Sequence, residues 1–318
     1  MLNYQPENLK LLNENFDVIT LPTPAHDKPQ ILNQADVIFA PLSYYCGKDK
    51  IDQSPKLKVI ASNTTGYPHI DVKYAAQKSI QVITLKGHDE FLKTITSTAE
   101  LTWGLIVAIS RNMFPAYQSV LDGKWNRRPF GGKSMLSRMS LGVVGYGRLG
   151  KMVASYGLCF GMTVRYYDPY VSDYEPCIER VNFLLELVRM SDIVTIHIPH
   201  EPETENLFNK KILTHFKKGA YLINTSRGEL IDHDALLKCL KDGILAGAAL
   251  DVLDGEYKDG LKDNIKDHLA WKYAQEHNNL ILTPHIGGST IDAWKMTEEY
   301  TIKLIINVLN RESDKRQS

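Results

Sequence analysis

Three stretches of the sequence carry side chains that can bind an anion or move a proton, and each follows an apolar run. LINTSRG ends with Arg227 and Gly228, AALDVLDGE carries Asp251 and Glu256, and LTPHIGGST carries His285. Taken singly, Arg227 can be a solvated loop residue, Glu256 a surface carboxylate, and His285 a cap for the helix that follows. Open α/β sheets, however, place ligands at the carboxyl ends of their strands. The three side chains can therefore converge on one crevice.

A glycine motif indicates which kind of ligand that crevice binds. GYGRLG fits G-x-G-x-x-G, with the apolar run 141–144 before it, a helix-like pattern ending near Gly161 after it, and Asp168 at the end of the next strand. Gly145 permits the tight turn, Gly147 lets a pyrophosphate approach the helix N-terminus, and Gly150 allows close packing of helix on strand. Without this context the motif could be an ordinary turn. The context predicts a dinucleotide site.

The type of dinucleotide follows from Asp168. Its carboxylate can accept hydrogen bonds from both hydroxyls of an adenosine ribose and would repel a 2′-phosphate. No arginine or lysine follows it within YYDPYVSDY. The sequence therefore predicts NAD rather than NADP.

The elements that position these residues alternate in type. Apolar runs at 141–144, 163–168, 193–199, 220–225 and 245–252 alternate with helix-like segments, which predicts βαβ units in a parallel sheet covered on both faces. A smaller α/β unit precedes them, with strands expected in 35–42, 57–63 and 80–85. Helices are expected at 97–113, at 267–277, and at 290–309. We expect residues 1–95 and 285–318 to form one domain, and residues 96–284 to form the dinucleotide domain.

Composition excludes several classes of protein. The chain has 318 residues, is 43% apolar, and balances 37 basic against 37 acidic residues. Zero net charge argues against nucleic acid or an anionic membrane as the main partner. No stretch is long enough to span a bilayer, and the N-terminus has no apolar signal core. The four cysteines are far apart in the sequence: Cys46, Cys159, Cys177 and Cys239. We therefore expect each to be a small buried apolar residue rather than part of a metal site. We also expect a cytoplasmic protein.

From about residue 35 to 300, the sequence resembles the D-isomer-specific 2-hydroxyacid dehydrogenases, most closely the phosphoglycerate-dehydrogenase type. GYGRLG, SDIVTIHIPHEPET, LINTSRGELID, AALDVLDGE and LTPHIGGST occur in the family's order. The resemblance implies an α/β protein with a Rossmann domain and a smaller flavodoxin-like substrate domain. It also implies hydride transfer between NAD and a 2-hydroxy or 2-oxo acid, substrate binding in a cleft that closes, and a homodimer.

The resemblance also assigns residues. Arg227 would bind the substrate carboxylate and carbonyl oxygen, His285 would be the acid/base, and Glu256 its partner. The implied cofactor contacts are Gly145, Gly147, Arg148, Leu149, Gly150, Asp168, Pro199, Thr204, Thr225, Ser226, Arg227, Asp251, His285 and Gly287. Thr64, Thr65 and Gly66 would contact the substrate together with Arg227 and His285.

Elementary chemistry agrees with these roles. Reducing a ketone puts negative charge on its oxygen, which a guanidinium stabilises and a near-neutral histidine protonates. A carboxylate beside the imidazole fixes its tautomer and favours its protonated form. A non-catalytic NAD-sensing scaffold of the same fold remains an alternative. A formate dehydrogenase is disfavoured, because that branch pairs its histidine with glutamine.

The substrate loop departs from the family pattern. It reads SNTTGYPHID, with His69 where the family has asparagine. Lys86, His88 and Lys93 follow in LKGHDEFLKTITSTAE. By the resemblance, these residues and His69 lie in loops that face the substrate cleft, where a buried ammonium without a partner is costly. We therefore predict a substrate with a polar or second anionic group beyond its carboxylate. If these residues are solvated, they imply nothing about the substrate.

Overall fold

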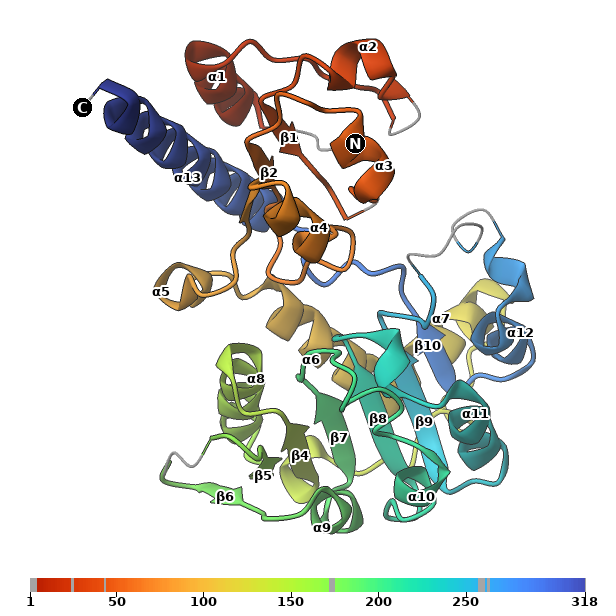
Figure 1. The fold of residues 1–318 in the computed structure, drawn as a ribbon. Helices are drawn as coiled ribbons and strands as arrows, with labels where there is room; N and C mark the ends of the chain where they lie inside the picture. Colours follow the sequence, from red (N-terminus) through yellow and green to blue (C-terminus); the bar gives the residue numbers. More distant parts are fainter. Residues whose placement is uncertain are drawn as a thin grey trace. The chain divides into compact units, whose positions relative to one another are not determined.

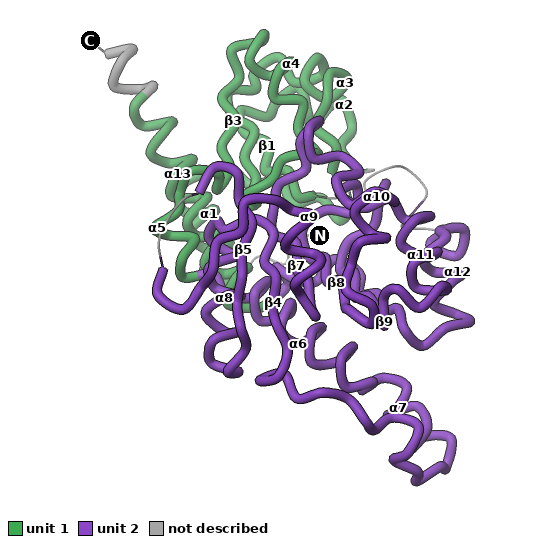
Figure 2. Tube along the Cα trace, turned by 90° about the horizontal axis from the view of Figure 1, so that it is seen from below, with its two compact units in different colours: residues 1–94, 290–318 green, residues 95–289 purple. Residues whose placement is uncertain are grey.

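The computed structural model describes residues 5–23, 26–42, 44–171, 175–256, 261 and 264–317, with side chains as far as residue 311. The chain folds into two compact units (Figure 2). Unit 1 comprises residues 1–94 and 290–318, and unit 2 comprises residues 95–289. His285 thus lies in unit 2, whereas the sequence put the boundary at this residue. The assignment of substrate binding to unit 1 stays a prediction.

Unit 1 contains a parallel three-stranded sheet with helices on both faces (Figure 1). The strands are β1 (Val37–Phe39), β2 (Val59–Ala61) and β3 (Gln81–Ile83), in the order β1-β2-β3. Successive strand residues face opposite sides. One side packs on α13 (Ile291–Gln317), and the other lies under α2 (Pro29–Leu32), α3 (Lys48–Asp52) and α4 (Val72–Gln77). Helices α1 (Pro6–Asn15) and α5 (Asp89–Leu92) complete the unit.

Unit 2 is built on a parallel seven-stranded sheet in the order β10-β9-β8-β7-β4-β5-β6. Its strands are β4 (Ser140–Val144), β5 (Thr163–Tyr167), β6 (Ile178–Arg180), β7 (Ile193–Ile196), β8 (Ala220–Asn224), β9 (Leu245–Leu250) and β10 (Leu280–Leu282). After β6 the chain crosses to the other side of β4, so the strand order reverses between β4 and β7. Ligands of such sheets bind at this reversal. The doubly wound architecture predicted from the sequence is confirmed.

Two apolar cores flank this sheet, as expected for strands that are buried on both faces. One core joins it to α6 (Ser97–Ser110) and α8 (Arg148–Cys159). The other joins it to α9 (Leu184–Met190), α10 (Lys210–Leu213), α11 (His233–Lys241) and α12 (Leu269–Glu276). Helix α12 confirms the helix expected at 267–277.

Two expectations about local structure were wrong. The helix expected to reach residue 113 ends at Ser110, because Asn112 takes a left-handed conformation (φ 52°) and a separate helix, α7 (Met113–Leu121), begins after it. Cys46 and Cys239 are buried as expected, but Cys159 and Cys177 are exposed. Cys159 is the last residue of α8, and Cys177 lies in a turn with φ 71°. None of the described helices is long and apolar enough to cross a membrane.

Candidate active site

The glycine motif forms the turn between β4 and α8. Gly145 has φ 90°, and a Cβ there would lie 2.6 Å from the backbone oxygen of His197 at the end of β7. A Cβ on Gly150 would lie 2.0 Å from the oxygen of Gly145. A Cβ on Gly147 would meet nothing within 4 Å. The turn is therefore tight at Gly145 and Gly150 and open at Gly147. This shape fits a pyrophosphate placed against the N-terminus of α8.

Asp168 fixes this turn as well as offering a carboxylate. It is only 9% exposed. Its Oδ2 accepts from the N–H of Tyr146 at 2.8 Å, and its Oδ1 accepts from the N–H groups of Tyr170 at 2.8 Å and Val171 at 3.1 Å. Each carboxylate oxygen has two lone pairs, so a ribose hydroxyl can still bind. The donor and acceptor groups of the turn thus fit a dinucleotide.

The sequence did not predict that a basic side chain lies near Asp168. Arg180, on the neighbouring strand β6, donates from Nη2 to the backbone oxygen of Asp168 at 3.3 Å. The sequence argument considered only the residues that follow Asp168 in the chain. Arg180 comes close through the pairing of β5 with β6, where residues 164–166 are in register with residues 178–180.

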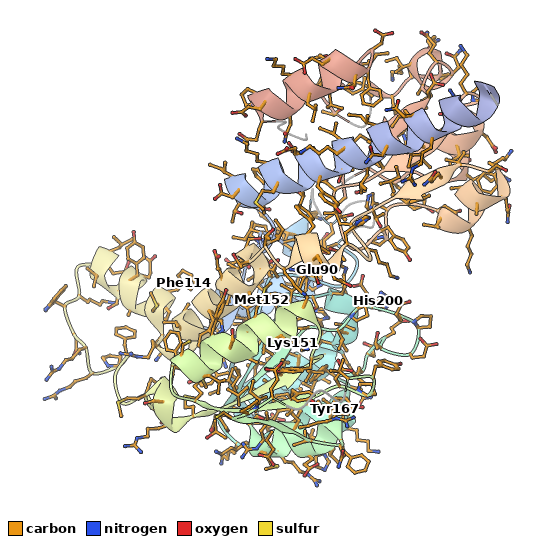
Figure 3. All side chains as sticks on the ribbon, turned by 90° about the vertical axis from the view of Figure 1, so that its left-hand side faces the viewer. Glu90, Phe114, Lys151, Met152, Tyr167 and His200 are labelled. Atoms are coloured by element: carbon orange, nitrogen blue, oxygen red, sulfur yellow. The ribbon has the colours of Figure 1, made fainter. Side chains whose placement is uncertain are left out.

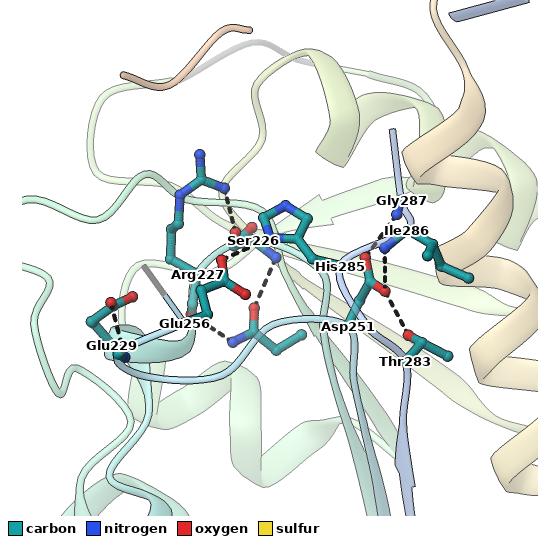
Figure 4. Close-up of polar contacts among 11 residues, drawn as sticks. Ser226, Arg227, Glu229, Asp251, Glu256, Thr283, His285, Ile286 and Gly287 are labelled. Atoms are coloured by element: carbon teal, nitrogen blue, oxygen red, sulfur yellow. Dashed lines mark hydrogen bonds and ion pairs between the residues drawn. The ribbon is translucent and has the colours of Figure 1, made fainter. Parts of the chain in front are cut away.

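The structure brings Arg227, Glu256 and His285 to the carboxyl edge of the sheet (Figure 4). Arg227 follows β8, Glu256 follows β9, and His285 follows β10. Nδ1 of His285 lies 2.7 Å from Oε1 of Glu256. Both side chains are largely buried, with exposures of 28% for His285 and 14% for Glu256.

Arg227 is held by its own turn. Its Nη1 donates to the backbone oxygen of Ser226 at 2.6 Å, and its backbone oxygen accepts from the side-chain amide of Asn224 at 2.7 Å. Nη2 has no hydrogen-bond partner among the described residues, and Figure 4 shows the guanidinium pointing away from the strands. A guanidinium in this position can bind a carboxylate through two parallel hydrogen bonds.

Asp251 holds the loop that carries His285. The carboxylate is 1% exposed, and it accepts from the hydroxyl of Thr283 at 2.6 Å and from the N–H groups of Ile286 at 2.9 Å and Gly287 at 2.8 Å (Figure 4). Burial raises the pKa of Asp251, and these three hydrogen bonds oppose the rise. His285 itself has φ 52°, and its N–H donates to the backbone oxygen of Asp251 at 2.8 Å. The sequence assigned Asp251 to the cofactor; the structure gives it this supporting contact.

The other residues assigned to the cofactor lie around the same edge. The hydroxyl of Thr225 is 2.9 Å from that of Thr102, and Ser226 donates to the oxygen of Ile196. Thr204 donates to the oxygen of Pro199 at 2.9 Å, which closes the turn after β7. Arg148 begins α8 next to Leu149, and its Nη1 donates to the oxygen of Ile95 at 2.9 Å. Their contacts with NAD stay a prediction.

The substrate-loop residues lie in unit 1, where two expectations change. His69 is 2% exposed, and its Nε2 lies 3.0 Å from the hydroxyl of Ser62 and 3.2 Å from the oxygen of Ala40. It is a buried structural residue rather than one facing a cleft. Thr64 donates to the oxygen of Gly66 at 2.6 Å, with Thr65 between them. Lys93 is 61% exposed and paired with Glu90.

With this geometry in place, comparison with known proteins identifies the family. The chain belongs to the D-isomer specific 2-hydroxyacid dehydrogenases, because residues 103–287 match that family's NAD binding domain. Unit 2 is therefore an NAD-binding Rossmann domain, and the family and cofactor predicted from the sequence are confirmed.

Individual relatives extend the match beyond that domain. A glyoxylate reductase of Thermofilum pendens is 34% identical, over 96% of this chain and 88% of its own length. A D-3-phosphoglycerate dehydrogenase of Methanocaldococcus jannaschii is also 34% identical, over 88% of this chain, which spans about half (51%) of that relative. The crystal structure of an Aquifex aeolicus D-lactate dehydrogenase complexed with NAD and lactic acid superposes with a TM-score of 0.77. It is 29% identical and covers 91% of this chain and 87% of its own.

Proposed function

We propose that this protein reduces a 2-oxo acid, or oxidises the corresponding D-2-hydroxy acid, with NAD as cofactor. The observation that carries the proposal is the 2.7 Å contact between His285 and Glu256 at the same sheet edge as Arg227. Acid/base catalysis needs an imidazole of fixed tautomer, and a carboxylate at Nδ1 fixes it. When bound, the nicotinamide supplies or accepts the hydride.

The side chains of this site divide the remaining work. Because Nδ1 of His285 bonds Glu256, Nε2 is the nitrogen that gives a proton to the carbonyl oxygen during reduction and takes it back during oxidation. Arg227 binds the substrate carboxylate and stabilises the charge that develops on the carbonyl oxygen. Glu256 stabilises the protonated imidazole. Asp251 keeps His285 in place through Thr283, Ile286 and Gly287.

Turnover tests this proposal directly. A series of 2-oxo acids, including glyoxylate, pyruvate, hydroxypyruvate and phosphorylated analogues, is offered with NADH, and loss of the nicotinamide absorbance is followed. We expect at least one of them to be reduced. NADH binding without reduction of any member of the series would instead support a non-catalytic NAD-sensing scaffold.

The structure removes one argument for a second anionic group on the substrate. That argument required lysines buried near the reaction, but Lys86 and Lys93 are exposed. Lys86 lies 3.3 Å from the hydroxyl of Tyr67, and Lys93 pairs with Glu90. The proposed substrate is therefore a 2-oxo acid without a required second anion. Variants Lys86→Ala and Lys93→Ala should keep the catalytic efficiency of the wild type with glyoxylate.

A homodimer is proposed from the surface of unit 2. Helix α7 has no buried residue, and its apolar side chains are exposed. Figure 3 labels Phe114 on this helix, and Figure 2 shows α7 extending away from the sheet. The exposed set comprises Met113, Phe114, Tyr117, Val120, Leu121 and Trp125. Apolar patches of this kind mark protein interfaces. Sedimentation velocity should show a dimer for the wild type and a monomer for the double variant Phe114→Asp, Tyr117→Asp.

A further inference from the structure

A carboxylate two residues before Glu256 is bound by two histidines from different helices. Nδ1 of His233 lies 3.0 Å, and Nε2 of His268 lies 2.9 Å, from the same oxygen, Oδ1 of Asp254. His233 is the first residue of α11, and His268 is the N-cap of α12. None of these three residues belongs to the site described above. We refer to them as the Asp254 cluster.

The cluster joins the chain segment after Arg227 to the segment before Glu256. The two backbones already touch, because a Cβ on Gly228 would lie 1.9 Å from the carbonyl carbon of Leu253. Glu229 accepts from the N–H of Gly255 at 3.4 Å. His233, six residues beyond Arg227, then binds Asp254. Any shift of Asp254 therefore alters the placement of Glu256 relative to Arg227.

The hydrogen bonds identify this cluster as a clamp of donors on a carboxylate. Nδ1 of His268 accepts from the N–H of Ala270 at 3.1 Å, so in the neutral ring Nε2 carries the hydrogen and donates it to Asp254. The bond from His268 lowers the pKa of Asp254, and burial lowers that of His233. Asp254 is thus an ionised acceptor near neutral pH.

The same residue types could also ligate a metal ion, and their ligand atoms lie within 4.8 Å of one another. A metal at Nε2 of His268, however, needs the lone pair of that nitrogen. The hydrogen would then move to Nδ1. That nitrogen could no longer accept from the N–H of Ala270, and α12 would lose its N-terminal cap. The observed bonding therefore favours a hydrogen-bond clamp over a metal site.

We propose that His233 and His268 are positioning residues that act through Asp254 to hold Glu256 against His285. This inference rests on the proposed dehydrogenase function and deepens it. It also assigns a role to α12, the helix in the segment between Glu256 and His285: its N-cap residue anchors the turn that carries the catalytic carboxylate. The cluster is connected to Glu256 from its N-terminal side, along residues 251–256, which the structure describes.

Kinetics of Asp254 variants test the clamp. Asp254→Ala should lower kcat for 2-oxo-acid reduction roughly ten- to hundredfold, the size expected when a catalytic group is displaced by about 1 Å. The dissociation constant for NADH should stay within about twofold of the wild type, because the nucleotide turn at Gly145–Gly150 is not involved. Asp254→Asn keeps an oxygen that accepts from both imidazoles, so it should restore most of the lost kcat. A purely structural role would lower thermal stability while leaving kcat per folded molecule unchanged.

Histidine variants separate the two anchors. Asn at 233 can place an amide N–H near the position of Nδ1, and Gln at 268 can do so for Nε2. We therefore expect His233→Asn and His268→Gln to retain more activity than His233→Ala and His268→Ala. His215→Ala is the matched control: it removes an exposed histidine of the turn after α10 whose Nδ1 contacts the oxygen of Lys211, and it should leave kcat unchanged.

Amide hydrogen exchange provides a readout that needs no substrate. In Asp254→Ala, the amides of Gly255 and Glu256 should exchange at least about tenfold faster, while Leu222 and Ala248 in the sheet stay protected. Unchanged exchange and unchanged kcat in Asp254→Ala would overturn the proposal, as would faster exchange with wild-type kcat. Activation by added Zn²⁺ that a chelator reverses would overturn it in favour of a metal site. Absence of turnover in the wild type would defeat the proposed function, and the clamp would still be judged by exchange.

Discussion

The two halves of the Rossmann sheet organise their ligand groups in different ways. At β4 and β5, backbone geometry makes the site: Gly145, Gly147 and Gly150 shape the turn, and one carboxylate, Asp168, binds three backbone N–H groups. At β8, β9 and β10, side chains make the site, and other side chains hold them. His285 depends on Asp251 and Glu256, and Glu256 follows a turn held by Asp254.

The difference shows which kinds of substitution each half tolerates. A turn shaped by glycines fails when an added Cβ has no space, as at Gly150. A site made of supported side chains fails by degrees, because each supporting residue contributes part of the placement. Substitutions of the acid/base pair and its supporting residues in the β8–β10 half should therefore change rates, whereas substitutions in the glycine turn of the β4–β5 half should change cofactor binding.

The largest expected effect comes from His285→Ala. It removes the group that transfers the proton, so kcat should fall by roughly 10²–10⁴-fold. NADH should bind with an affinity within about threefold of the wild type, since the turn at Gly145–Gly150 is intact. Stopped-flow reduction and fluorescence titration of NADH measure the two quantities. If His285→Ala loses NADH binding together with turnover, the two halves of the sheet do not separate catalysis from cofactor binding.

A smaller effect is expected for Asp168→Ser. Removing the carboxylate relieves its conflict with a 2′-phosphate, which is worth ~1–3 kcal/mol, so the preference for NADH over NADPH should fall about tenfold or more. Arg180, which bonds the backbone oxygen of residue 168, remains and should contribute to the gain. The ratio of catalytic efficiencies with the two cofactors is the measurement.

Two outcomes bear on this prediction. Adding Arg180→Ala to Asp168→Ser should reduce the gain with NADPH, whereas Arg165→Ala, on the adjacent strand β5 and paired with Glu179, is the control that should not. An unchanged ratio in Asp168→Ser would show that Asp168 serves only the backbone of its turn.

Glu256→Gln should have a milder effect on the rate. Glutamine keeps an oxygen that can accept from Nδ1 of His285, so the ring stays oriented and kcat should fall by about tenfold or less. The fall comes from the lost negative charge beside the imidazole. Steady-state kcat for 2-oxo-acid reduction measures it, and a wild-type kcat in this variant would exclude Glu256 from the role.

The smallest expected effect concerns stability at the reversal between the two halves, where His197 follows β7. The residue is partly exposed, yet its Nδ1 is buried and has no hydrogen-bond partner among the described residues. Burial lowers the pKa of His197 to about 3, well below its usual value. The unfolded chain therefore binds a proton more readily than the folded one.

The sign of the pH dependence follows. Neutral His197 adds to the free energy of unfolding, and this addition is fully present above about pH 6.5 and is lost as the pH falls toward 3. Between pH 7 and 5 the free energy of unfolding should fall by about 1–2 kcal/mol. Urea unfolding at the two pH values measures it. In His197→Gln the loss should be smaller by that amount; equal losses in both proteins would exclude His197 as the source.

The sequence predicted the fold and the glycine turn because both depend on patterns among residues that are close in the chain. Apolar runs alternating with helical segments imply a parallel sheet, and glycines at fixed spacing imply a turn. It missed β6 and α7. Strand β6 has only three residues with one buried, and α7 begins after Asn112 adopts a left-handed conformation, which sequence spacing alone does not reveal.

The supporting residues were missed for a different reason. His233, Asp254 and His268 are ordinary residues at a helix start, a turn and a helix cap, and only the fold brings them together. Arg180 was missed because it approaches Asp168 across two strands rather than along the chain. His69 and the lysines at 86 and 93 were judged without their burial. The catalytic roles of Arg227, Glu256 and His285 stay predictions, and the variants of Glu256 and His285 above test two of them.

The left-handed backbone of His285 has a consequence for directed evolution. A residue other than glycine pays roughly 1 kcal/mol or more to hold φ at 52°, and asparagine and glycine tolerate this conformation best. A library randomised at position 285 and selected only for folded yield should therefore enrich glycine or asparagine. The same library selected for turnover should return histidine, so this position would separate the sequences that fold best from those that catalyse.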